Sequence, residues 1–165
     1  MELNAIIGRS EHPGDAHALE AQKSLTSAYN FLAGLPGNDY SGTELAGLTL
    51  DPGTYKFTSS VKLSNGILYL DAKLNINAEW VFQIGSSLTT AEGAEVRVIN
   101  GGSPYNVYWQ IGSSASIFQD TIFVGNIVAL TSISLASNVS LTGRALARNG
   151  AVTMVSNLIK SFSCY

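Results

Sequence analysis

The chain of 165 residues is long enough to bury a substantial core within one domain, and it is 45% hydrophobic and 13% charged. Its net charge of −3 comes with no basic cluster, which argues against a surface that follows a nucleic-acid phosphate backbone. The single cysteine, Cys164, excludes an internal disulfide and a multi-cysteine metal site, and no apolar run approaches the ~20 residues of a membrane span. Polarity comes instead from hydroxyl groups, since 20 Ser and 11 Thr outnumber the 21 charged residues.

The first predicted elements of this single domain, residues 1–165, are an N-terminal segment, residues 1–14, and one helix, residues 15–34. The first ten residues lack the basic start and the long apolar stretch of a secretory signal. Asp15 is the predicted N-cap of the helix, and Gly34 ends it. Apolar residues at helical spacing form one stripe, which predicts that the helix packs on the rest of the domain: Ala18, Ala21, Leu25, Ala28, Tyr29 and Leu32.

Residues 35–49 are interpreted as a loop, and residues 50–160 repeat. Corners of mostly small residues begin at positions 58, 85, 112, 130 and 148, which are 27, 27, 18 and 18 residues apart. A step of 27 is one step of 18 with a nine-residue insertion, and residues 100–106 (NGGSPYN) fit such an insertion. A fixed period near 18, rich in β-branched and aromatic residues, indicates a β-solenoid. Three short strands and three corners in each lap predict a triangular cross-section.

The three strands of a lap differ in character. The strand before the corner is apolar in both alternations (WVFQI, VYWQI, NIVAL and RALAR), as expected for a strand covered on both faces. The helix is the one element free to cover it. The third strand is predicted to present a mixed surface with these residues pointing outward: Glu95, Arg97, Thr121, Phe123, Ser140 and Thr142.

The strand after the corner carries the candidate site. Because side chains alternate along a strand, one set should point into the core: Leu88, Ala115, Ile133 and Ala151. The outward set, with the residues that flank it, forms the predicted binding face: Ser87, Thr89, Ser114, Ser116, Ser132, Ser134 and Val152, with Gly150 ending the flanking row. Solubility alone is one explanation of such hydroxyls. The face avoids Lys and Glu, however, which are the usual means of keeping a sheet soluble, and its small side chains suit a flat, repeating partner.

The sequence gives little support for a catalytic site or a metal-binding site. The acidic residues of the repeat fall at different phases: Asp51, Asp71, Glu79, Glu92, Glu95 and Asp120. Enzymes built on β-solenoids usually stack carboxylates across laps, so the sequence predicts no catalytic residues. His12 and His17 are five residues apart across a Pro-Gly and are interpreted as solvated histidines. We therefore expect no enzyme activity, no metal and no cofactor.

Five stretches carry a specific resemblance: LAGLTLDPGTYKFTSSVKL, WVFQIGSSLTT, VYWQIGSSASI, FVGNIVALTSISL and LTGRALARNGAVTM. From about Asp15 to Cys164 the chain resembles the microbial ice-binding (antifreeze) protein family of fungi and bacteria. The resemblance implies a right-handed, discontinuous parallel β-helix with one long helix alongside, secretion, and neither cofactor nor catalysis. It also implies binding to ice through one flat face and inhibition of ice growth and recrystallisation. The choice of face residues above comes from the repeat and not from a family motif.

The partner expected on this reading is the surface of an ice crystal, with no nucleic acid and no membrane insertion. The alternative is an adhesion or carbohydrate-binding β-solenoid without ice activity. The family normally carries further coils before the helix, whereas this chain starts almost at the helix. We therefore expect an uncapped first lap near Tyr55, with Val61 and Leu63 partly wet, and self-association through that end.

Overall fold

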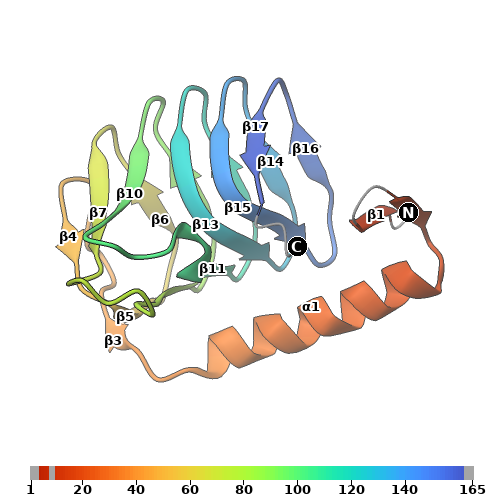
Figure 1. Ribbon diagram of the computed structural model, residues 1–165, viewed down its shortest axis with the longest axis horizontal. Coiled ribbons are helices and arrows are strands. Elements are labelled where there is room, and N and C mark those ends of the chain that lie inside the picture. Colours follow the sequence, from red (N-terminus) through yellow and green to blue (C-terminus); the bar gives the residue numbers. More distant parts are fainter. Residues whose placement is uncertain (1–3, 8–9, 162–165) are drawn as a thin grey trace.

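The computed structural model describes residues 4–7 and 10–161, with side chains from Pro13 onward. It is a parallel β-helix whose laps stack side by side, with one long helix running along the stack (Figure 1). The predicted fold class, mainly β with a triangular solenoid and one helix, is confirmed. Cys164 and the side chain of His12 lie outside the described residues.

The strands of each lap lie on three faces. Face a consists of β3 (Asn38–Asp39), β5 (Gly53–Phe57), β8 (Trp80–Ile84), β11 (Val107–Ile111) and the second halves of β13 (Ile122–Ala129) and β15 (Ser140–Ala147). Face b consists of β6 (Val61–Leu63), β9 (Leu88–Thr90), β12 (Ala115–Ile117), β14 (Ile133–Leu135) and β16 (Val152–Met154). Face c consists of β4 (Thr49–Leu50), β7 (Ile67–Asp71), β10 (Glu95–Ile99), the first halves of β13 and β15, and β17 (Leu158–Lys160).

The register of face a confirms the repeat. Five residues pair in succession across the laps, at the predicted steps of 27, 27, 18 and 18: Phe57, Ile84, Ile111, Ala129 and Ala147. In the 18-residue laps, β13 and β15 run from face c into face a without a break. In the longer laps, residues 72–79 and 100–106 separate the two faces, and the second of these contains the 3-10 helix η1 (Pro104–Asn106). The extra residues therefore lie at the edge between faces c and a.

Glycines keep the corners of the solenoid tight. The two long strands bend at Gly125 and Gly143, whose φ angles of 115° and 147° favour glycine. A Cβ on Gly143 would overlap the carbonyl group of Gly125 in the neighbouring lap. At the corner between faces a and b, a Cβ on Gly112 would overlap the carbonyl group of Gly85. Neighbouring laps thus approach each other more closely at these corners than side chains would allow.

Aromatic rings form a column through the core. The ring centroids of Tyr55 and Phe82 are 5.5 Å apart, and those of Phe82 and Trp109 are 3.9 Å apart, both in stacked arrangement. Phe123 continues the column at 5.0 Å from Trp109, and Tyr40 ends it with an edge-on contact to Tyr55 at 4.8 Å. Such pairs add to the free energy gained by burying the rings, so the column ties successive laps together.

Helix α1 (Ala16–Gly34) begins as predicted, because the Asp15 carboxylate accepts hydrogen bonds from the backbone N–H groups of His17 and Ala18. Its apolar stripe covers face a, where its buried side chains contact Val81 and Val128: Tyr29 and Leu32, with Leu25 half-buried beside them. The predicted placement of the helix is thus confirmed. The predicted apolar stripe wrongly included Ala21 and Ala28, however, since both are exposed.

Two polar side chains fasten the helix to the sheet. Gln83 donates from Nε2 to the carbonyl oxygens of Leu32 and Leu35, at 2.7 Å each. Arg148 donates from Nε to Thr26 Oγ1 at 3.3 Å, and its guanidinium lies 4.9 Å from the ring centroid of Tyr29. The N-terminal half of the helix continues past the last lap to an antiparallel hairpin of β1 (Asn4–Ile7) and β2 (Ser10–Pro13) (Figure 1).

The first lap is capped, which corrects two expectations. Residues 35–49 are not simply a loop, because β3 and β4 pair with β5 and β7 and form a partial coil under the first lap. Leu45 of this coil is fully buried. Val61 and Leu63 are only 5% and 0% exposed, so the predicted wet edge near Tyr55 is wrong. This coil could not be predicted from the sequence because its strands are only two residues long.

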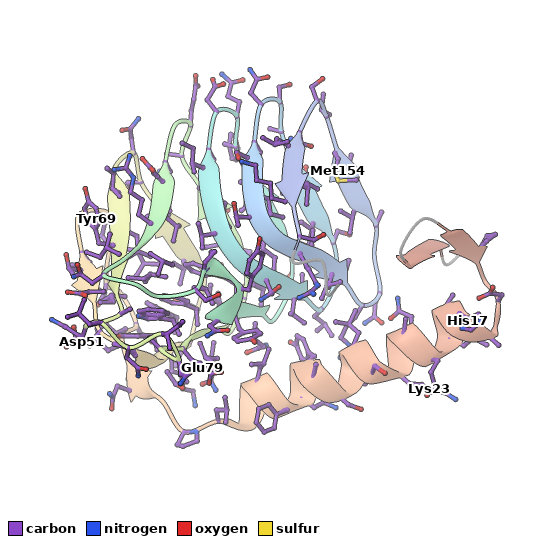
Figure 2. All side chains as sticks on the ribbon, in the orientation of Figure 1. His17, Lys23, Asp51, Tyr69, Glu79 and Met154 are labelled. Carbon is purple, nitrogen blue, oxygen red and sulfur yellow. The ribbon has the colours of Figure 1, made fainter. Side chains whose placement is uncertain are left out.

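The last described lap is less buried than the laps before it. Met154 and Ile159 pair with Leu135 and Leu141, which are buried, yet they are themselves 53% and 39% exposed. Figure 2 shows Met154 at this end, far from Asp51 at the capped end. Two more apolar side chains of the lap, Val155 and Leu158, are more than half exposed. Core positions of the last lap therefore face solvent among the described residues.

Candidate functional site

Face b is a stack of five parallel strands of three residues each. The first and third residues of each strand point into the core. The first set is Val61, Leu88, Ala115, Ile133 and Val152, and the third is Leu63, Thr90, Ile117, Leu135 and Met154. All of them are buried except the two on the last strand. The middle residues must point outward, and neighbouring strands hold them ~4.7–4.9 Å apart.

The middle residues of the three central strands form what we call the hydroxyl row: Thr89, Ser116 and Ser134. The paired register places each directly beside the next. Their hydroxyl groups make no hydrogen bond with any residue that the structure describes, and their side chains are half-buried or exposed. They are thus available to solvent. Lys62 and Thr153 end the row on the first and last laps.

A second row flanks the first on the side of face a. We call it the corner row, and it consists of Ser60, Ser87, Ser114 and Ser132. Its hydroxyl groups bind along the stack: Ser60 Oγ and Ser87 Oγ are 2.9 Å apart, and Ser114 Oγ accepts from the backbone N–H of Ser132 at 3.3 Å. These bonds engage the hydroxyl groups of Ser60, Ser87 and Ser114, so three of the four side chains of the corner row are held in place before any partner arrives.

The structure brings together six of the seven predicted face residues and corrects the seventh. Val152 pairs with Ile133 and packs against the core, so it points inward. Thr153, which pairs with Ser134, takes the outward position. Ala151 accepts from the backbone N–H of Ile133 and so continues the corner row in place of Gly150. The last corner contains one residue more than the repeat predicts, and this extra residue reverses the side-chain phase of the last strand.

The prediction for face c was also partly wrong. Thr121 and Phe123 are fully buried, whereas Ile122 and Val124 occupy the outward positions. The buried Thr121 hydroxyl is satisfied inside the core, 3.2 Å from Thr90 Oγ1 and 3.3 Å from the carbonyl oxygen of Ala91. The outward residues of this face range from Tyr69 and Arg97 to Thr142. Face c is therefore uneven in size and charge, in contrast to face b.

Two acidic side chains, Asp71 and Glu44, are engaged in hydrogen bonds within the fold. Asp71 accepts from Asn100 Nδ2 at 2.7 Å, and this hydrogen bond, with that of the Lys73 backbone N–H, lowers the pKa of its carboxyl. Partial burial works to raise the pKa of Glu44, but hydrogen bonds from the Ala46 and Ser64 backbone N–H groups and the Ser64 hydroxyl lower it overall.

Other ionisable groups are likewise engaged in structural contacts. The Glu95 carboxylate is paired with Arg97, and Asp120 accepts from Asn138 Nδ2 at 3.1 Å. Burial raises the pKa of the Tyr55 hydroxyl to about 12. That hydroxyl donates to the carbonyl oxygen of Asp51, so it ties the chain locally. Among the described residues, no three His, Cys, Asp or Glu side chains come together as metal ligands would.

Other sites of interest are few in the part of the chain that the structure describes. None of its helices is long and apolar enough to cross a membrane. His17 lies exposed at the start of α1 (Figure 2). An open depression on face c lies between β10 and η1 and is lined by Val96, Val98 and Pro104, with the Glu95–Arg97 pair beside it. It has no aromatic side chain in its lining, so it does not resemble a sugar-binding platform.

Comparison with known proteins identifies similar sequences and folds. A family model described as "Ice-binding-like" matches residues 4–160. The chain is 50% identical over 163 residues to an ice-binding protein of Nostoc sp. (strain HG1), an alignment that covers 98% of this chain and 60% of that protein. It is 34% identical over 146 residues to ice-binding protein 1 of Shewanella frigidimarina, covering 85% of this chain and 16% of that protein.

Solved structures show the same architecture. An ice-binding protein from an Antarctic biological consortium superposes with a TM-score of 0.84 at 43% identity, covering 88% of this chain and 67% of that one. An ice-binding protein of the Antarctic ascomycete Antarctomyces psychrotrophicus superposes with a TM-score of 0.85 at 32% identity, covering 89% of this chain and 72% of that one. The chain spans 60% of the Nostoc protein and 16% of the Shewanella protein.

Proposed function

We propose that this chain, which belongs to the ice-binding-like family, adsorbs to ice through face b and limits the growth and recrystallisation of ice. The observation that carries the proposal is the pair of aligned rows: the hydroxyl row, whose groups are available to solvent, lies beside the corner row, in which the hydroxyl groups of Ser60, Ser87 and Ser114 are held by hydrogen bonds. Both rows lie on one parallel sheet backed by the core.

The proposed mechanism depends on area and rigidity. Each small hydroxyl or methyl group contributes little, but many groups that are already in place lose little conformational entropy on binding. Along the stack the rows repeat at ~4.7–4.9 Å, and along a strand same-face side chains repeat at ~6.6–6.8 Å. The face is therefore a two-dimensional lattice that can hold ordered water and bind a lattice of ice through it.

A direct test is growth of ice grains in a frozen sucrose film. We expect the purified chain to keep the grains small at micromolar concentration, because many weak contacts act together on a crystal surface. The heat-unfolded chain at the same concentration is the control, since it has the same composition without the aligned rows. Grains that coarsen equally in both samples would contradict the proposal.

On the same proposal, the protein is a secreted, non-enzymatic ice-binding protein that acts in the cold. We further propose that the hairpin, α1 and the laps act as one domain, because α1 is fastened to the sheet through Gln83 and Arg148.

The adhesion alternative gains no specific support, since Phe118 is the one aromatic side chain on or beside face b in the described part of the chain. Binding on a glycan array without any effect on ice grains would favour that alternative.

We also propose that the chain self-associates through the exposed apolar side chains of the last described lap. Strand edges and exposed apolar core positions together favour pairing with another chain, and they coincide at β16 and β17. We expect Met154→Glu to reduce the association measured by sedimentation, because it places a charge in the contact. Leu74→Glu is the matched control, since Leu74 is 85% exposed and lies far from the last lap. A parent chain that sediments as a monomer would contradict this proposal.

A further inference from the structure

One aromatic side chain interrupts the small side chains at the centre of face b. Beyond the hydroxyl row, on the side of face c, a third row runs along the stack: Ser64, Ala91, Phe118, Ala136 and Val155. Ala91, Phe118 and Ala136 each directly follow the last residue of a strand, in β9, β12 and β14. Because β12 lies between β9 and β14 in the sheet, Ala91 and Ala136 lie on either side of Phe118. Phe118 is 49% exposed.

The backbone at Phe118 is held firmly. Its N–H donates to Thr90 Oγ1 at 2.9 Å. Thr90 is only 1% exposed, and its hydroxyl lies 3.2 Å from that of Thr121. This buried pair of threonines fixes the point from which the ring projects. The backbone of Phe118 is therefore held in place, and its half-exposed ring starts from a point between the methyl groups of Ala91 and Ala136.

We infer that Phe118 sets the edge of the ice-contacting area on the side of face c; this inference rests on the proposed function of face b. A ring is several atoms taller than the methyl groups of Ala91 and Ala136. A flat crystal surface that meets the ring cannot also touch the third row. Contact is then restricted to the hydroxyl row and the corner row, and Phe118 limits both the width of the contact and the choice of crystal plane.

The test is to replace the ring of Phe118 with a small side chain. In Phe118→Ala the third row becomes small from Ser64 to Ala136, so the contact gains a third row. We expect the concentration needed to stop recrystallisation to fall by about two-fold or more, and the shape of ice crystals grown in the protein to change. Phe118→Ser should act in the same direction, because the effect comes from height and not from the added methyl group. Phe31→Ala is the matched control, since Phe31 is 67% exposed on α1, away from face b.

Two outcomes would overturn the inference. Unchanged activity in Phe118→Ala and Phe118→Ser would mean that the ring lies outside the contact, and reduced activity in both would mean that it binds ice directly. Thermal melts of each variant separate these outcomes from unfolding. A Ser116→Tyr variant measured in parallel separates them from failure of the proposed function: if that variant keeps full activity, face b itself is not the ice-contacting surface.

Discussion

Replacing Leu32 with aspartate is expected to reduce the free energy of unfolding by about 3–5 kcal/mol, the largest stability effect that we predict. Leu32 is 7% exposed and packs with Tyr29 against Val81 and Val128. An aspartate there would place a charge in an apolar contact that offers it no partner. For a domain of this size the change corresponds to a fall in melting temperature of roughly 10 °C, measurable by circular dichroism. Leu25→Asp should have a smaller effect because Leu25 is only half-buried.

The neighbouring residue of the helix supplies the control. Phe31 lies next to Leu32 in sequence but is 67% exposed. Phe31→Asp introduces the same charge into the same helix without entering the contact, so its free energy of unfolding should stay within about 0.5 kcal/mol of the parent. If Leu32→Asp melted at the temperature of Phe31→Asp, the contact between α1 and face a would contribute little to stability.

Ser116→Tyr is expected to abolish the inhibition of ice recrystallisation while leaving the fold intact. Ser116 is the central member of the hydroxyl row. A tyrosine there would stand above the small side chains around it and keep a flat crystal surface away from both rows. Because the position points to solvent, the free energy of unfolding should change by only about ±0.5 kcal/mol. The concentration needed for inhibition should rise by at least about ten-fold.

Thr142→Tyr is the matched control for this experiment. Thr142 is half-buried and points outward from β15 on face c, so the same bulk is added to another face of the same solenoid. Its activity should equal that of the parent. Loss of activity in Thr142→Tyr, with full activity in Ser116→Tyr, would place the ice-contacting surface on face c.

Much of this architecture could be predicted because apolar strand residues and small corner residues alternate at a regular period. Nearly the same residues occur at the corners that begin at positions 85 and 112 and in the strands around them. The register of face a could therefore be predicted from the sequence alone. The helix was equally visible, since Asp15 and Gly34 mark its ends. These features depend on local chemistry and on a fixed period, both of which a single sequence displays.

The errors arose where one residue or one hydroxyl group decides the geometry. The last corner has one residue more than the earlier ones, and only the pairing of Val152 with Ile133 reveals this. Thr121 and Phe123 were assigned to the surface because the predicted alternation was one residue out of phase, since Glu95 pairs with Ile122. The Thr121 hydroxyl instead has a partner in Thr90 on the previous lap, and a pairing between residues so far apart in sequence leaves no local signal.

The position of the long insertions has a consequence for how such a chain can change over time. Laps of 27 and of 18 residues stack on each other, and the two long insertions, residues 72–79 and 100–106, lie at the edge between faces c and a. Length can therefore drift at that edge while the hydrogen-bonded register of face b stays the same. An insertion of a single residue between faces a and b, by contrast, would turn an entire strand of hydroxyl groups inward. Selection on the exposed rows should then tolerate gaps at one edge of the triangle and remove them at the other, except at the end of the stack, where the additional residue of the last corner leaves Thr153 in the outward position.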